Sequence, residues 1–324
     1  FKTRRAVLKI QPFSPFFVER RDNCLNCGIC MDACVYGVHT RTFIEMDAPA
    51  NEKCVHCHRC VSECPVNALT IHWNPNIVRD EDEYYNREVI KRIMFEAETA
   101  KVPVSGAGYG GKFAGRGFDS MWTDMSEIVR PTRDGIHGRE FISTEVDIGR
   151  KPPYVPLDGS DMPNTYKIHL PIFFADIPEQ FLHIVSEVAK IAGTFVLSQA
   201  PFEITEIIAG QDIISKVTSA ISSGNYCIHL RFDRYGYDAD NRHMIDALLE
   251  LDEALTIQQV REQVTILVSG GIAMAEHVAK AIICGADAVG IDIAALIAMG
   301  MTKLDDLSQI SPDEVAKQRL INLL

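Results

Sequence analysis

Eight cysteines with a regular spacing lie near the amino-terminal end of the sequence. They form two runs, and the second repeats the first after 30 residues: Cys24-x-x-Cys27-x-x-Cys30-x-x-x-Cys34 and Cys54-x-x-Cys57-x-x-Cys60-x-x-x-Cys64. Of the ten cysteines in the chain, only Cys227 and Cys284 lie elsewhere. Such a concentration favours a local metal site in a reducing compartment over a disulfide framework, because thiolates are strong ligands for iron and zinc.

The spacing resembles that of bacterial two-cluster ferredoxins, and this resemblance covers roughly residues 16–75. In that pattern three cysteines of a run hold one cluster, and the fourth points away and serves the other cluster. The resemblance therefore implies two 4Fe-4S clusters, the first held by Cys24, Cys27, Cys30 and Cys64, and the second by Cys54, Cys57, Cys60 and Cys34. The alternative is a pair of structural zinc sites, which would not need this spacing twice.

The segment after the cysteines is a polar linker followed by a predicted amphipathic helix, in which Ile90, Ile93 and Met94, with Ala97 beyond, follow helical spacing. A glycine-rich stretch follows at 102–119, and it is either a connector or a phosphate cradle. The polar run at 130–140 is either a solvated loop or the lining of a site for an anionic ligand or another cofactor.

Two further stretches carry a second resemblance: RPTRDGIHGREFIST, at 130–144, and VTILVSGGIAMAEHVAKAIICGADAVGIDIAALIAMG, at 264–300. Together with the cysteine block, they resemble the glutamate-synthase-like FMN-binding family. The resemblance implies a β/α barrel of the TIM type that binds FMN through the ends of its last two strands. The FMN phosphate contacts that it implies are Ser269, Gly270, Gly271, Gly290 and Ile291. The alternative is that Ser-Gly-Gly forms only a strand-to-helix turn.

The barrel looks short. Strands are predicted near 167–175, 193–198, 226–232, 264–269 and 286–292, with a sixth near 203–208, whereas a complete barrel has eight. The expected fold class is therefore a small α+β ferredoxin-like domain followed by an α/β, TIM-type barrel, which is either shortened or has segments missing from this numbering. The predicted domains are 1–75 for the clusters, 76–166 for the linker and connector, and 167–324 for the barrel. Lys280 is predicted on the helix after the phosphate turn, either at the surface or near the phosphate.

Two functions fit these features. The first is a glutamate-synthase-like oxidoreductase in which single electrons pass through the clusters to or from FMN. The second is a non-catalytic electron-transfer subunit whose barrel is a docking platform in a larger redox complex. No catalytic residue is assigned, and the expected partners are redox proteins or other subunits. A net charge of −12 disfavours nucleic acid, and the absence of an apolar run of about 18 residues or a signal peptide predicts a cytoplasmic protein without a membrane span.

Overall fold

The computed structural model describes residues 14–74, 82–101, 115–121, 144–151, 165–301 and 313–324. The chain divides into two compact units, one of residues 1–101 with 297–322 and one of residues 102–296 with 323–324. Most of the glycine-rich stretch and the whole polar run at 130–140 lie outside the described residues. The domain boundaries predicted at 75 and 166 stay a prediction. Among the described helices, none is both long and apolar enough to cross a membrane.

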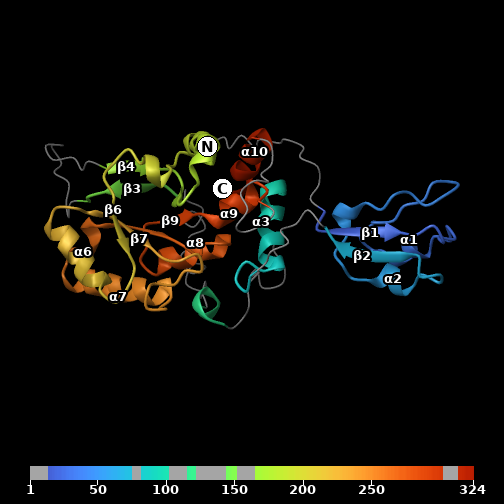
Figure 1. The fold of residues 1–324 in the computed structure, drawn as a ribbon, viewed down its shortest axis with the longest axis horizontal. Helices are drawn as coiled ribbons and strands as arrows, with labels where there is room; N and C mark the ends of the chain where they lie inside the picture. Colours follow the sequence, from blue (N-terminus) through green and yellow to red (C-terminus); the bar gives the residue numbers. More distant parts are fainter. Residues whose placement is uncertain (1–13, 75–81, 102–114, 122–143, 152–164, 302–312) are drawn as a thin grey trace, which may run out of the picture. The chain divides into compact units, whose positions relative to one another are not determined.

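The cysteine-rich part of the first unit is built on a two-stranded antiparallel sheet (Figure 1). Strand β1 (Phe16–Arg20) pairs with β2 (Leu69–Trp73), and the two cysteine runs lie between them in the sequence. Each run contains one short helix, α1 (Ile29–Ala33) or α2 (Arg59–Ser62), and η1 (Asn51–Lys53) is a single 3-10 turn between them. The buried core joins aliphatic and aromatic side chains of the strands to three cysteines: Phe16, Val18, Val38, Met46 and Leu69 with Cys30, Cys54 and Cys60.

The predicted amphipathic helix is confirmed as α3 (Arg87–Thr99), which buries Ile90, Ile93 and Ala97. The side chain of Asn86 caps its first turn by accepting from two backbone N–H groups. Helix α10 (Asp313–Leu323) contacts α3, and in this contact Asn322 Nδ2 donates to the carbonyl of Ala97 at 2.7 Å.

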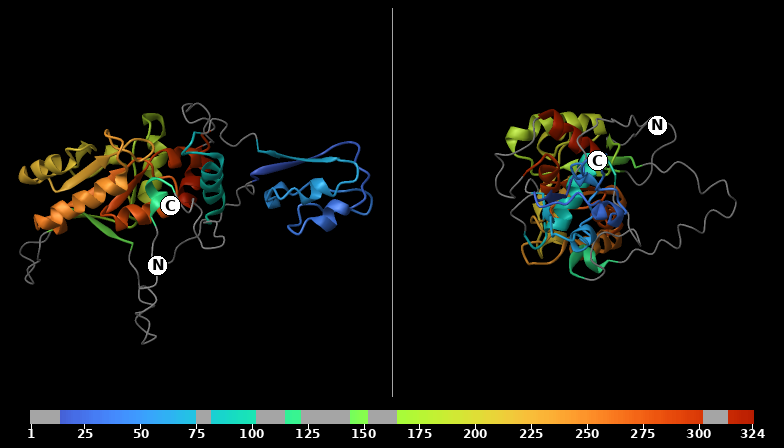
Figure 2. Two further views of the ribbon diagram at one scale, coloured as in Figure 1. Left: turned by 90° about the horizontal axis from the view of Figure 1, so that it is seen from below. Right: turned by 90° about the vertical axis from the view of Figure 1, so that its right-hand side faces the viewer.

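The second unit is an α/β fold in which helices alternate along the chain with the strands of a five-stranded parallel sheet (Figures 1 and 2). Its strands are β5 (Ile172–Phe174), β6 (Thr205–Ile208), β7 (Cys227–Arg231), β8 (Thr265–Ser269) and β9 (Ala288–Ile291). Between successive strands come α5 (Leu182–Ala192), α6 (Ile213–Ser222), α7 (Met244–Ile257) and α8 (Ala275–Ile283), and α9 (Ile293–Ala298) follows β9. Single 3-10 turns lie at η2 (Gly117–Ser120), η5 (Glu179–Phe181), η6 (Leu197–Gln199) and η7 (Arg261–Gln263).

The order β5-β9-β8-β7-β6 pairs the first strand of this series with the last. That neighbourhood is the one that a β/α barrel requires, and it confirms the predicted α/β class. Two strand predictions need correction. The predicted strand 167–175 is divided at Pro171, which has no N–H for a ladder. Near 193–198 only Val196 forms a bridge, to Phe174, before the chain turns into η6.

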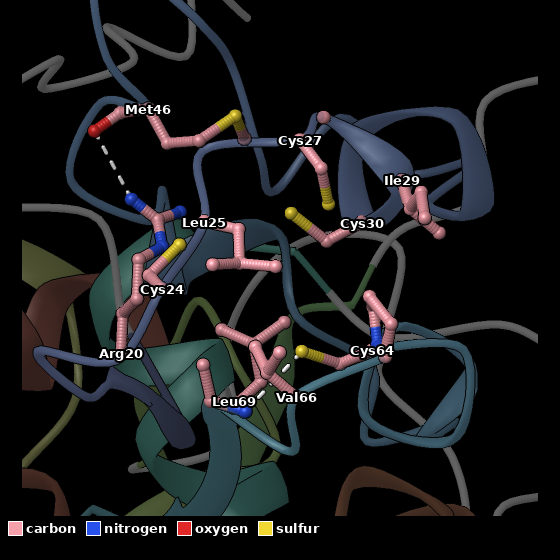
Figure 3. Close-up of a pocket in the computed structure, with 13 residues that line it drawn as sticks. Arg20, Cys24, Leu25, Cys27, Ile29, Cys30, Met46, Cys64, Val66 and Leu69 are labelled. Carbon is pink, nitrogen blue, oxygen red and sulfur yellow. Dashed lines mark hydrogen bonds between the residues drawn. The ribbon is translucent and has the colours of Figure 1, made fainter.

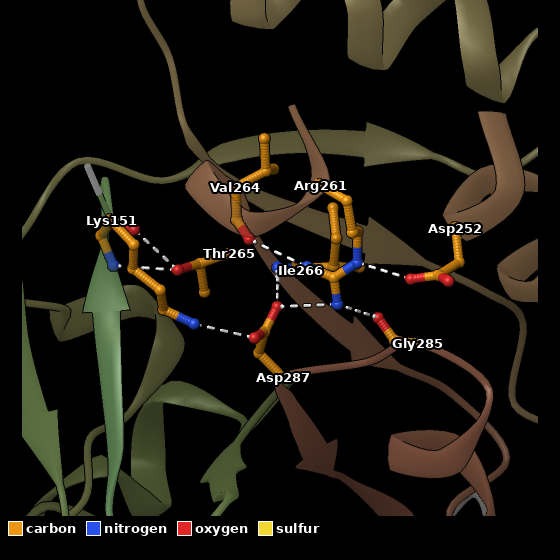
Figure 4. Close-up of polar contacts among 9 residues, drawn as sticks. Lys151, Asp252, Arg261, Val264, Thr265, Ile266, Gly285 and Asp287 are labelled. Atoms are coloured by element: carbon orange, nitrogen blue, oxygen red, sulfur yellow. Dashed lines mark hydrogen bonds and ion pairs between the residues drawn. The ribbon is translucent and has the colours of Figure 1, made fainter. Parts of the chain in front are cut away.

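The amino end of the sheet is closed by a hairpin of β3 (Val146–Gly149) and β4 (Thr165–Ile168). Ile148 and Ile168 pack with the inward-facing apolar side chains of the parallel strands. A polar network at the same end joins the hairpin strand to β8 and β9, because Thr265 Oγ1 donates to the carbonyl of Gly149 at 2.8 Å (Figure 4). In the same network Asp287 Oδ1 accepts a hydrogen bond from Lys151 Nζ at 2.9 Å.

Candidate iron–sulfur centres

The first hollow in the cysteine-rich part is lined by Cys24, Cys27, Cys30 and Cys64 (Figure 3). The rest of its lining is mostly aliphatic, from Leu25, Ile29, Val66 and Leu69. Three of these cysteines come from the first run and one from the second. The structure therefore brings together the four cysteines that were predicted as one ligand set.

The second hollow is lined by Cys34, Cys54, Cys57 and Cys60, with Val18, Val38 and Ile71 among its apolar neighbours. Here three cysteines belong to the second run and one to the first. Among the described residues, no three Cys, His, Asp or Glu side chains converge on a point that could hold a single metal ion. A cubane bonds its four thiolates to four different irons, and four cysteines around a hollow are the ligand set that it needs.

The backbone explains why two similar hollows form. Asn26 and Gly28 in the first loop have positive φ angles of 52° and 83°, and His56 and His58, 30 residues later, have φ angles of 60° and 59°. Left-handed residues within such a loop turn successive N–H groups to one side, which makes a concavity for anions such as iron–sulfur clusters. The helix that follows each loop then begins at the same position of the repeat.

The thiols need a cationic partner to ionise in these hollows. Burial raises the pKa of Cys30 and of Cys54, and burial together with the neighbouring thiols Cys34 and Cys54 raises the pKa of Cys60 to about 11. Iron would supply the positive charge that holds four thiolates together. Arg20 adds a fixed positive charge to the first hollow, and its guanidinium is anchored by the carbonyls of Met46 and Asp47 at 3.0 and 2.8 Å.

One backbone N–H is directed at a predicted ligand. The amide of Ala68 donates to Cys64 Sγ at 3.2 Å. Hydrogen bonds to ligand sulfurs raise cluster potentials, so this contact would tune the first cluster. In the second loop, His58 is exposed and His56 is half-buried, with its ring stacked on that of Phe16 at 4.4 Å and its Nε2 atom 3.0 Å from that of His58.

The residues implied as FMN contacts lie together at the carboxyl end of the parallel sheet. Ser269 of β8 pairs in register with Gly290 of β9, and Gly270 and Gly271 follow β8 with φ angles of 104° and 69°. Their outer side is covered by the chain itself. A Cβ atom on Gly270 would lie 2.4 Å from the carbonyl oxygen of Asp233, and one on Gly271 would lie 2.5 Å from the amide nitrogen of Gly236.

Neither glycine could carry a side chain, because the segment 232–236 packs directly against the turn. Ser269 is fully buried, and its hydroxyl already bonds to Nε2 of His229 at 2.8 Å. Lys280 does not face this turn or the surface: it is buried, and its ammonium donates to the carbonyl of Phe118 at 2.5 Å.

Sequence reasoning missed a polar cluster at this end of the sheet. Arg231 ends β7, and its guanidinium lies 3.6 Å from Glu206 of β6 and 3.2 Å from Asp176, which follows β5. His229 lies below them with its Nδ1 atom 3.4 Å from Glu206, and burial lowers its pKa. The signal in the sequence was the alternation Cys227, His229, Arg231, which places three polar side chains on one face of the strand.

Comparison with known proteins agrees with both resemblances. Residues 242–306 match the conserved region in glutamate synthase, and residues 21–37 and 50–70 each match a 4Fe-4S binding domain. The chain is similar to glutamate synthases and carries two 4Fe-4S binding motifs. The archaeal-type glutamate synthase [NADPH] of Dehalococcoides mccartyi is 31% identical over 52% of this chain and 33% of its own length. That of Thermotoga maritima is 27% identical over 59% of this chain and 39% of its own length.

The chain thus spans between a third and two fifths of these two relatives. Among solved structures, mandelate oxidase with benzoyl-formic acid is 14% identical with a TM-score of 0.34, covering 56% of this chain and 79% of its own. A mutant flavocytochrome b2 with benzoylformate is 19% identical with a TM-score of 0.28, covering 45% of this chain and 32% of its own. Similarity at this level is too low to indicate a function.

Proposed function

We propose that this chain is an electron-transfer module of a glutamate-synthase-like redox protein, in which single electrons pass through two 4Fe-4S clusters. The observation that carries the proposal is the composition of the two hollows. Each is lined by three cysteines of one run and one of the other. Because each run supplies one ligand to the other run's site, the two clusters would lie in one small core. An electron could then move from one cluster to the other.

The ligand sets can be tested by substitution and anaerobic reconstitution. Cys24→Ser and Cys64→Ser should lose the same signal in an EPR-monitored redox titration, although these residues are 40 positions apart in the sequence. Cys34→Ser and Cys54→Ser should both lose the other signal. Cys284→Ala is the matched control, because this buried cysteine lies in the other unit and should leave eight irons per chain.

The result would contradict the proposal if Cys64→Ser and Cys54→Ser removed the same signal, since the runs would then act separately. A wild-type protein with two zinc ions and no acid-labile sulfide would support the zinc alternative instead. Loss of all iron in Cys284→Ala would show that iron loss reports unfolding and not ligation.

The resemblance also predicts that FMN in the barrel exchanges electrons with the clusters. FMN would supply the step between one-electron and hydride chemistry. Our proposal ends at the clusters, and the FMN contacts stay a prediction. The buried residue Asp292, which directly follows the predicted contacts Gly290 and Ile291, favours a second candidate, in which the parallel-sheet unit docks the clusters to a redox partner or another subunit. Flavin analysis of anaerobically purified protein separates the two, because the docking platform needs no flavin.

A further inference from the structure

An acidic residue lies at the end of β9, where the resemblance places the flavin phosphate. Asp292 follows Gly290 and Ile291 directly, and its side chain is buried, with 7% of the residue exposed. Its Oδ1 atom accepts the backbone N–H of Ile293 at 2.6 Å. The second backbone N–H after this strand is therefore already bonded to a carboxylate of the chain itself.

The neighbouring groups also disfavour an incoming anion. The amide of Ala175 donates to the carbonyl of Ile291 at 3.0 Å, which brings the next residue, Asp176, to the same end of the sheet. Burial, with a contribution from Asp176, raises the pKa of Asp292 to about 7, whereas Arg234 acts in the opposite direction. Above that pH a phosphate dianion at this place would face two carboxylates.

The side-chain donor of the adjacent turn is already used. The hydroxyl of Ser269 is bonded to His229, and the carbonyls of Phe232 and Asp233 would lie 2.7 and 2.4 Å from a Cβ on Gly270. The position therefore accepts no side chain. A used hydroxyl and buried negative charge thus act together at this end of the sheet.

From this arrangement we infer that Asp292 is a specificity-determining residue, whose carboxylate occupies the anion position at the carboxyl end of β9 and excludes phosphate-bearing ligands. A small residue at this position would release the N–H of Ile293 and remove the nearest negative charge. The inference does not depend on the clusters, because every residue that carries it lies in the parallel-sheet unit.

The test measures binding of FMN and of inorganic phosphate to the cluster-loaded protein by equilibrium dialysis at pH 8, where the Asp292 carboxyl is mostly ionised. Asp292→Ser removes both the volume and the charge, and Asp292→Asn removes the charge while keeping the volume. Glu253→Gln is the matched control, since it removes one exposed negative charge from α7. Circular dichroism verifies that each variant is folded.

We expect wild type and Glu253→Gln to retain well below one FMN per chain, and Asp292→Ser to bind FMN or phosphate about tenfold more tightly or better. Asp292→Asn should lie between them. One FMN bound per wild-type chain would overturn the inference. The dialysis of wild-type protein therefore tests the inference even if both variants fail to fold. Folded Asp292→Ser and Asp292→Asn proteins that bind no more tightly than wild type would overturn it as well.

Discussion

Replacing Asp287 with alanine should destabilise the parallel-sheet unit, because this carboxylate joins three segments at the amino end of the strands (Figure 4). Its Oδ1 atom accepts from Lys151 Nζ at 2.9 Å, and its Oδ2 atom accepts the backbone N–H of Ile266 at 2.8 Å. The guanidinium of Arg261 lies 3.4 Å from the same oxygen. One substitution therefore removes a contact to the segment after β3, a contact to β8 and a contact to η7.

The size of the effect follows from how exposed each partner is. The Lys151 side chain is 30% exposed, so its ion pair contributes at most about 1 kcal/mol. The residue Ile266 is 1% exposed, and leaving its N–H unpaired costs about 1–3 kcal/mol. Arg261 keeps Asp252 at 2.6 Å, so its charge stays paired. The total is about 2–4 kcal/mol, which corresponds to a fall in Tm of roughly 5–15 °C for a unit of this size.

Thermal unfolding followed by circular dichroism measures this difference. Asp287→Asn should fall between wild type and Asp287→Ala, because the amide oxygen can still accept from Ile266. Asp212→Ala is the matched control: its carboxylate forms an ion pair with Lys216 at 3.0 Å, but its side chain is 58% exposed. That variant should change the free energy of unfolding by less than about 1 kcal/mol. Equal losses in Asp287→Ala and Asp212→Ala would refute the reasoning.

Two further predictions concern charge. Burial lowers the pKa of His243 to about 4, so this histidine is neutral in the folded state near neutral pH. Its contribution to the free energy of unfolding is fully present above about pH 6.5. That contribution is lost as the pH falls towards 4, because protonation then favours the unfolded chain. His243→Asn keeps an acceptor for the N–H of Ile245, and it should flatten the pH dependence of unfolding in that window, whereas exposed His183→Asn should leave it steep. In the other unit, Arg20→Gln should make the potential of the first cluster more negative by some tens of millivolts, because a nearby cation favours the reduced cluster. EPR-monitored titration tests this, and an equal shift from Arg21→Gln, at an exposed position, would contradict it.

The cysteine-rich part was predictable because its information is local. Each loop and its helix form within about ten residues, and the same left-handed positions recur after 30 residues, as Asn26 and His56 show. The two 4Fe-4S binding motifs are confirmed by comparison, while the division of the cysteines into ligand sets stays a prediction that the hollows support.

Lys280 shows why other expectations were wrong. Its place on an amphipathic helix after a turn predicted an exposed or ligand-facing side chain. In the structure it is buried, because its partner Phe118 comes from a segment 162 residues earlier and stacks on His277 at 4.4 Å. A local pattern gives the face of a helix, but it does not reveal which distant segment covers that face.

The polar cluster at the carboxyl end depends on a feature that no single strand encodes. Arg231 of β7 contacts Asp176 beyond β5, although β8 and β9 separate these strands in the sheet. The ring of His229 lies 5.9 Å from that of Phe173 across the same two strands. These distances require the sheet to curl into a concave face. Five strands that curl in this way bring their ends together as a barrel does, so a short barrel still assembles one polar site where β/α proteins bind ligands. Within this cluster the guanidinium of Arg231 is already paired with two carboxylates, those of Asp176 and Glu206.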